Sequence, residues 1–136
     1  MKPEQLFKNR FRNLLFSMGA SVSFHEDRYT IGTPDISYGL NGVNGWIEAK
    51  YLDKWPKSGV VKIDHYTPQQ KNWLMERGKA GGKCFLLVGV GSEMMLFDHE
   101  TAQDVGEMQQ HTMVISAKWC SNTNCPQKIL LNVLTK

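Results

Sequence analysis

The sequence lacks the features of membrane proteins and of secreted scaffolds. It has three cysteines, Cys84, Cys120 and Cys125, an odd number that builds no disulfide framework and fits a reducing compartment. No apolar run approaches the roughly 20 residues of a membrane span, and the most continuous one, 84–88, has the length of a strand. The first residues lack the apolar stretch of a signal peptide, so we expect a cytoplasmic protein without membrane association.

The composition is that of one folded domain. The chain has 136 residues, of which 41% are hydrophobic, 10% aromatic and 21% charged, and no repeat or low-complexity linker divides it. We therefore expect a single domain over 1–136. The net charge of +3 is unevenly spread, because 1–83 holds thirteen Lys and Arg against eight Asp and Glu, and 84–136 holds three against five. This asymmetry indicates an anionic partner, although a solvated basic surface would have the same composition.

Hydrophobic periodicity predicts alternating helices and strands. Helices are expected over 3–18, where apolar residues recur at three- and four-residue spacing, and over 67–79, where Thr67 and Gln70 have the spacing of a capping box. Strands are expected over 20–24, 35–40, 46–52, 84–90, 94–97 and 113–117, with a short polar helix over 99–109 and either state over 127–134. The continuous apolar run at 84–90 is typical of a central strand covered on both faces. The order predicts an α/β sandwich built on a mixed sheet.

Two carboxylates and a lysine fall on one face of the predicted hairpin. Asp35 and Glu48 are separated by twelve residues, and Glu48 and Lys50 alternate on one strand, so both project to the same side. With a turn over 41–44, the register pairs Asp35 with Lys50 and Ser37 with Glu48, and the opposite face is mostly apolar. Converging carboxylates repel unless a cation lies between them, and oxygen ligands favour Mg²⁺. An exposed Asp–Lys pair without function is the alternative reading of these residues alone.

The surrounding sequence resembles the PD-(D/E)xK nuclease superfamily. Gly32-Thr33-Pro34-Asp35 followed by Trp46-Ile47-Glu48-Ala49-Lys50 is similar to its signature, and Thr67-Pro68-Gln69-Gln70 begins a segment similar to the glutamine-containing helix of the virus-type replication-repair (VRR-NUC) branch. The resemblance covers Glu4 to about Val90, so it implies a catalytic core over 3–90 and leaves 91–136 without a role. It also implies the restriction-endonuclease-like fold, an α/β sandwich with helices flanking a mixed β-sheet.

The resemblance implies roles for individual residues. Asp35, Glu48 and the backbone carbonyl of Ala49 would bind the metal, Lys50 would be the catalytic lysine, and Glu4 would be an outer or second-metal ligand. Gln70 would orient Lys50 or the attacking water, with Gln69 as its competitor for that role. Two of these residues have structural alternatives: Glu4 as an acid favoured in a first helical turn, and Gln70 as part of the helix cap.

Basic and aromatic residues around the motif fit a nucleic-acid partner. The candidates for DNA contacts are Lys8, Arg12, Lys54, Trp55, Lys57 and Lys62, with Arg10, Tyr66, Arg28 and Tyr29 as further ones. Trp55 lies between two lysines, where it could stack on an exposed base or pack against the domain surface.

The resemblance predicts the chemistry more closely than the substrate. Small stand-alone members of the superfamily resemble Holliday-junction resolvases and phage junction-cutting enzymes of recombination and repair. We therefore expect a Mg²⁺-dependent endonuclease that cuts branched DNA, with Mn²⁺ as a substitute, in a bacterial or phage setting. Symmetric cutting of a four-way junction needs two active sites and hence a homodimer. A general nicking or restriction-like endonuclease, and a non-catalytic DNA-binding domain of the same fold, are the alternatives.

Overall fold

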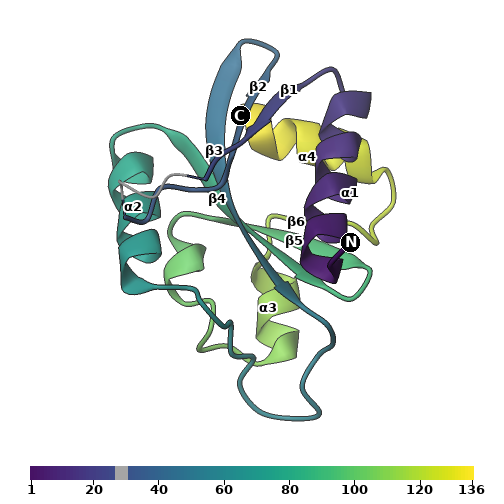
Figure 1. The fold of residues 1–136 in the computed structure, drawn as a ribbon, viewed down its shortest axis with the longest axis vertical. Helices are drawn as coiled ribbons and strands as arrows, with labels where there is room; N and C mark the ends of the chain where they lie inside the picture. The colour runs from purple at the N-terminus through teal and green to yellow at the C-terminus, as the bar shows by residue number, and fades with distance from the viewer. Residues whose placement is uncertain (27–30) are drawn as a thin grey trace.

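A computed structural model describes residues 1–26 and 31–136. Figure 1 shows a twisted sheet with helices on both sides. Along the chain the elements are α1 (Pro3–Ser17), β1 (Ser21–Phe24), β2 (Ile36–Leu40), β3 (Val43–Leu52), α2 (Pro68–Lys79), β4 (Lys83–Val90), β5 (Glu93–Asp98), the 3-10 helix η1 (Thr101–Gln103), α3 (Gln110–Ser116), β6 (Trp119–Cys120) and α4 (Pro126–Thr135). Within the described ranges, no helix has the length and apolar character needed to span a bilayer.

The six strands form one mixed sheet in the order β1-β2-β3-β4-β5-β6. Neighbouring strands are antiparallel except for β3 and β4, which are parallel. A parallel pair needs a crossover connection, and α2 lies in the segment that joins β3 to β4. Helix α2 begins as predicted: Thr67 and Gln70 form a reciprocal capping box, and Pro68 occupies the first turn.

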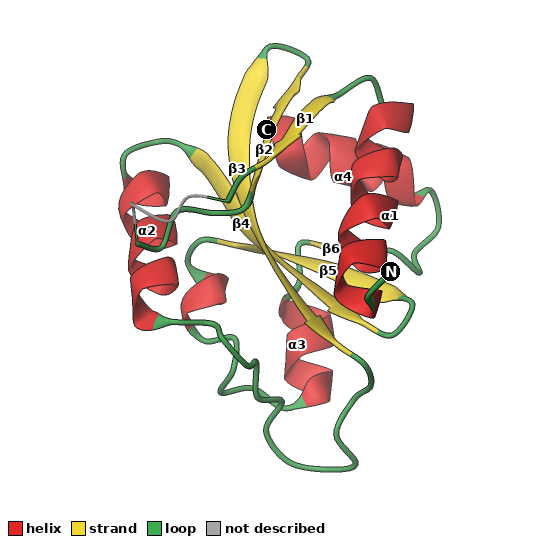
Figure 2. Cartoon of the chain, in the orientation of Figure 1, coloured by secondary structure: helices red, strands yellow, loops and turns green. Residues whose placement is uncertain are grey.

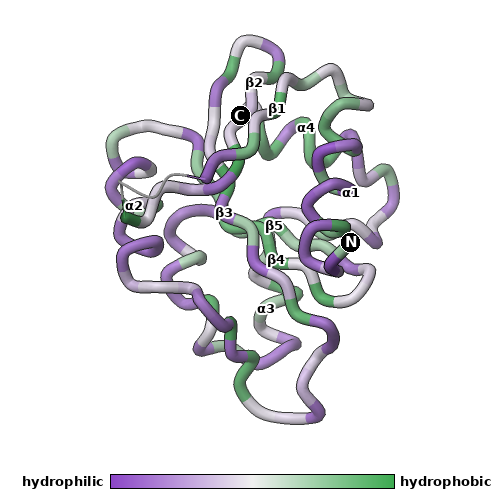
Figure 3. The backbone as a smooth tube through the Cα atoms, viewed as in Figure 1, coloured by the Kyte–Doolittle hydropathy of each residue, from purple (hydrophilic) through white to green (hydrophobic). Residues whose placement is uncertain are grey.

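Two hydrophobic clusters, one on each face of the sheet, form the core. Figure 2 shows the helices on the two sides of the sheet. Helices α1 and α4 cover one face, and α2, η1 and α3 cover the other. Strand β4 contributes Phe85 and Leu87 to the first cluster and Leu86 and Val88 to the second. The prediction of a central strand covered on both faces is therefore confirmed. Figure 3 shows hydrophilic residues along much of α1 and α2 and hydrophobic residues where the central strands cross.

The β2–β3 hairpin differs from the predicted register by two residues. Its turn consists of Asn41 and Gly42 alone, both with positive φ (50° and 80°), as a type I′ turn requires. Leu40 therefore pairs with Val43 and Ile36 with Ile47, so the predicted pairs, including Ser37 with Glu48, are wrong. A shift of two residues keeps every side chain on its face, so the apolar face is buried as expected.

Residues 91–136 complete the sheet and its core. Strands β5 and β6 extend the sheet beyond β4, and Trp119, Leu130 and Leu134 are buried in the α1–α4 cluster. Three predictions in this part need correction or completion. The stretch 113–117 lies largely in helix α3, 99–109 contains only the short η1, and the undecided 127–134 is helix α4. Residues 113–115 carry the β-branched pattern of a strand, but Met113 alone is buried there, against the face that α3 covers.

Candidate functional site

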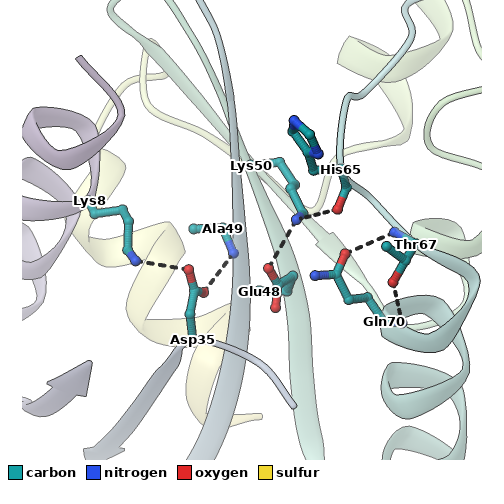
Figure 4. Close-up of polar contacts among 8 residues, drawn as sticks. All are labelled: Lys8, Asp35, Glu48, Ala49, Lys50, His65, Thr67 and Gln70. Carbon is teal, nitrogen blue, oxygen red and sulfur yellow. Dashed lines mark hydrogen bonds and ion pairs between the residues drawn. The ribbon is translucent and has the colours of Figure 1, made fainter. Parts of the chain in front are cut away.

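The hairpin brings the two motif carboxylates next to each other. Asp35 directly precedes β2 and Glu48 directly follows Ile47 in β3, and the last pair of this ladder joins Ile36 to Ile47. Figure 4 shows the carboxyl groups of Asp35 and Glu48 on either side of the β3 backbone, with Lys50 beyond Glu48. Asp35, Glu48 and Lys50 therefore meet in one cluster, although the pairing that brings them there is not the predicted one.

A proline opens the ladder at this point. Continuing the β2–β3 register by two residues would set Pro34 opposite Ala49, but proline has no N–H to donate to the next strand. The Ala49 N–H donates instead to Asp35 Oδ1 at 3.0 Å. A strand residue directs its N–H and C=O toward the same neighbour, so the Ala49 carbonyl lies on the Asp35 side as well. That carbonyl is thus free of the ladder and available as a third oxygen donor.

The Glu48 carboxyl group is the main electrostatic anomaly of the cluster. Its residue is 4% exposed, and it is the one buried charged residue in the part of the chain that the structure describes. Burial first, and the nearby Asp35 charge second, raise the pKa of Glu48 to about 7, against the opposing effect of Lys50. Lys50 Nζ lies 3.4 Å from Glu48 Oε2, which leaves the buried charge only partly compensated.

Lys50 is held by a backbone carbonyl from the loop that follows β3. Its Nζ donates to the His65 carbonyl at 2.8 Å, and its side chain is 11% exposed. His65 has a positive φ of 62°, a conformation that non-glycine residues seldom adopt. The next residue, Tyr66, donates its hydroxyl to the Ala102 carbonyl at 2.7 Å and so fixes the loop to η1. This contact could not be predicted from the sequence, because any residue at position 65 supplies the same carbonyl.

Gln70 forms the predicted capping box and lies beside the cluster; its role in orienting Lys50 or the water stays a prediction. Its Oε1 accepts from the Thr67 N–H at 2.9 Å, and its own N–H donates to Thr67 Oγ1 at 3.2 Å. In Figure 4 the amide nitrogen of its side chain is directed toward Glu48. Gln69 is exposed on the same helix. The capping box thus fixes Gln70 beside the cluster, and Gln70 rather than Gln69 is the residue available to it.

Lys8 of α1 faces the cluster instead of solvent. Its Nζ lies 2.9 Å from Asp35 Oδ2 and also lies over the Phe24 ring, 5.1 Å from the centroid. Arg12, one turn later, lies over the same ring at 4.9 Å. Both cations are therefore packed on protein groups, and the DNA contacts expected of them stay predictions. Lys8 is the member of the cluster that the sequence did not predict. Its position next to the buried Phe7 was the available signal.

Glu4 is not brought to the carboxylate pair. It is exposed in the first turn of α1, and among residues 1–26 and 31–136 no three His, Cys, Asp or Glu side chains gather to hold a metal. The first helix thus supplies Lys8 to the cluster, and Glu4 is an exposed acid in the first turn of the helix, which is the structural alternative to metal binding. The carboxylates of Asp35 and Glu48 with the Ala49 carbonyl make an oxygen-only donor set, and this set fits Mg²⁺ in its chemistry.

The loop between β3 and α2 carries the remaining basic candidates. Lys54, Lys57 and Lys62 are exposed on it, at the end of the strand that bears Lys50. Trp55 is half-buried and packs against the α2–α3 cluster, as the packing alternative requires. Tyr66 is also partly buried there, Arg10 is exposed and donates to the Ser92 carbonyl, and Arg28 and Tyr29 lie outside the described residues.

Comparison with known proteins gives a structural relative and no sequence relative. No protein-family model matches the chain, and no curated protein matches it. A solved structure of Hjc, a Holliday junction resolvase from the archaeal hyperthermophile Archaeoglobus fulgidus, is similar with a TM-score of 0.53 and 14% identity, over 73% of this chain and 75% of that one. At this identity the likeness concerns the fold. The chain thus has an α/β fold of the restriction-endonuclease-like type, a mixed six-stranded sheet flanked by helices, as the sequence predicted.

Proposed function

We propose that this protein is a Mg²⁺-dependent endonuclease that hydrolyses phosphodiester bonds in branched DNA. The observation that carries the proposal is the cluster of Asp35, Glu48 and Lys50, in which a buried carboxyl group, a second carboxyl group and an ammonium group meet beside a ladder-free carbonyl. The likeness of the fold to a Holliday junction resolvase supports the substrate class. The VRR-NUC resemblance of the α2 segment is part of the same proposal.

We assign the metal to Asp35, Glu48 and the Ala49 carbonyl, and their oxygen-only chemistry supports this assignment. When bound, the ion would polarise a phosphate oxygen and supply positive charge where negative charge develops. The chain's own contribution is positional. The capping box holds Gln70 near Glu48, and Ala49 N–H orients Asp35 through Oδ1. A cation held by these two carboxylates would oppose the burial and the Asp35 charge that raise the pKa of Glu48.

Lys50 is the residue we assign to the reacting groups. An ammonium has three N–H donors, and two of those on Lys50 are directed to the His65 carbonyl and to Glu48 Oε2. The third has no partner within the described ranges and is available for the attacking water or a phosphate oxygen. Because the side chain is nearly buried, its charge is little screened and can stabilise the transition state effectively.

The proposed site also implies contacts with DNA phosphates and a second subunit. The exposed lysines Lys54, Lys57 and Lys62 would contact phosphates beside the cleaved bond, and their contribution would weaken with salt. Paired cuts on a four-way junction require two copies of the cluster, so we propose a homodimer.

The test is cleavage of defined substrates. A four-way junction, a linear duplex, a single strand and RNA are incubated with Mg²⁺ and with chelator. We expect paired, symmetric cuts in the junction with Mg²⁺ only. Lys50→Ala should abolish cutting and keep junction binding, whereas Lys128→Ala, an exposed lysine on α4, should cut normally.

Three other outcomes would change the proposal. Equal cutting of the linear duplex would replace the junction preference with a general nicking or restriction-like activity. An unchanged rate in Lys50→Ala would refute the site. Binding without cleavage in Mg²⁺ and Mn²⁺ on every substrate would indicate a DNA-binding domain.

A further inference from the structure

The carboxylate cluster already contains a protein cation that the nuclease motif does not include. Lys8 Nζ lies 2.9 Å from Asp35 Oδ2, and the Lys8 side chain is only 16% exposed. The other oxygen of the same carboxylate, Oδ1, accepts the Ala49 N–H. Both Asp35 oxygens are therefore engaged by the protein itself, as Figure 4 shows.

The position of Lys8 is fixed by the helix that carries it. Phe7 and Phe11 of α1 are buried in the first core cluster, and the Phe7 ring packs against Tyr51 of β3 with centroids 5.5 Å apart. The Lys8 ammonium then lies over the Phe24 ring at 5.1 Å before it reaches Asp35. A lysine whose ammonium lies against both an aromatic ring and a carboxylate, with little of its side chain exposed, differs from a mobile surface lysine, which would gain little from such a pair.

We propose that Lys8 is the resident cation of this site, and that a divalent metal must displace it from Asp35 in order to bind. The inference rests on the proposed function, because it concerns the same pair of carboxylates. A metal ion needs the oxygen that Lys8 holds, and a dication a few ångströms from an ammonium is repelled strongly in a partly buried site. Lys8 therefore lowers the metal affinity of the free protein and is a positioning residue for Asp35.

The same contact explains what a displaced Lys8 can do. An ammonium that leaves Asp35 has lost its only ion-pair partner in the described part of the chain. It remains tethered to α1, next to the site, where a DNA phosphate is the anion that the proposed reaction brings. Lys8 would then exchange Asp35 for a phosphate, so DNA binding would favour metal binding and metal binding would favour DNA binding.

The test is metal binding without DNA, measured by isothermal titration of Mn²⁺ into the full chain. Lys8→Met keeps most of the side-chain length and removes the charge, and Lys8→Gln is the second variant if the first does not fold. Lys128→Met is the matched control, since it removes one positive charge from an exposed position on α4. We expect Lys8→Met to bind Mn²⁺ at least roughly tenfold more tightly than the wild type, and Lys128→Met to match the wild type.

The outcomes separate this inference from the proposed function. Equal Mn²⁺ affinity in Lys8→Met and the wild type would overturn the inference and leave the metal site intact. Weaker binding in Lys8→Met would overturn it too, because Lys8 would then support the site. No Mn²⁺ binding in any variant would refute both the metal site and the inference. Tighter binding in Lys8→Met, together with no DNA cleavage by the wild-type protein, would support the inference and refute the nuclease.

Discussion

Replacing Glu48 by glutamine should make the metal-free protein more stable at neutral and alkaline pH. Glu48 is buried beside Asp35, and its pKa is raised from the ordinary 4.5 to about 7 by burial and by the Asp35 charge. Between these two values the folded protein keeps a proton that the unfolded chain has released. The free energy of unfolding therefore falls as the pH rises from about 4.5 to about 7, and stays lower above that. Glu48→Gln has no proton to lose and escapes this fall.

The size of the effect follows from the two pKa values. A rise from 4.5 to about 7 corresponds to about 3 kcal/mol, since each pKa unit is worth about 1.4 kcal/mol. Glutamine has nearly the same shape, and its amide oxygen can still accept from Lys50 Nζ, so little packing is lost. We expect the stability of Glu48→Gln relative to the wild type to increase by about 3 kcal/mol between pH 4.5 and pH 8.

The assay is urea unfolding with chelator at a series of pH values. The control Glu76→Gln removes an exposed carboxyl group from α2 and should give a profile parallel to the wild type. Adding Mg²⁺ at pH 8 should stabilise the wild type and not Glu48→Gln, since ligand binding to the folded state adds to stability. Parallel profiles for Glu48→Gln and the wild type would show that Glu48 ionises normally, and would refute the electrostatic description of the site.

Two further substitutions test how the rest of the chain supports the site. Tyr66→Phe removes the hydrogen bond to the Ala102 carbonyl, so the free energy of unfolding should fall by about 1 kcal/mol. Single-turnover cleavage should also slow. An unchanged cleavage rate would show that this anchor does not position Lys50. Trp119→Ala removes a side chain that is 2% exposed, together with the donor to the Pro126 carbonyl. The free energy of unfolding, measured in urea, should fall by about 3–5 kcal/mol. A fall below about 1 kcal/mol would mean that the C-terminal part packs only loosely on the core.

The sequence predicted best where local rules and burial agree. Helix α2 has a capping box and a first-turn proline, and the run that became β4 is apolar throughout, so both were predicted correctly. The buried face of the hairpin was predicted correctly, because alternation survives a shift of two residues. The register was not, because the expected turn over 41–44 is longer than the turn that Asn41 and Gly42 form with their positive φ values. Residues 113–117 were assigned wrongly, because their β-branched pattern was overridden by helix α3, which buries its Met113 in the core cluster on that face of the sheet.

The candidate site was predictable as far as side chains define it. Asp35, Glu48 and Lys50 could be found from spacing, because a strand places alternate residues on one face. The His65 carbonyl could not be found from residue type, because every residue has the same backbone groups, and the Ala49 carbonyl was predicted only through the family resemblance. Lys8 was predicted only as a DNA contact, because a lysine on a helix with several basic residues has that composition. Only the packing of α1 on β3 shows that its ammonium reaches Asp35.

The loop between β3 and α2 links the strand that bears Glu48 and Lys50 to residues far along the chain. Val61 is fully buried, and its N–H donates to the Met108 carbonyl at 2.8 Å beside the isolated Val60–Gln109 bridge. Tyr66 is fixed to η1 in the same way. Because His65 lies between these anchors, the carbonyl that holds Lys50 is positioned by residues 102–109, which carry no part of the motif. Residues 91–136 therefore help to position the candidate site as well as to complete the sheet. Without them, the His65 carbonyl that accepts from Lys50 would not be held in place.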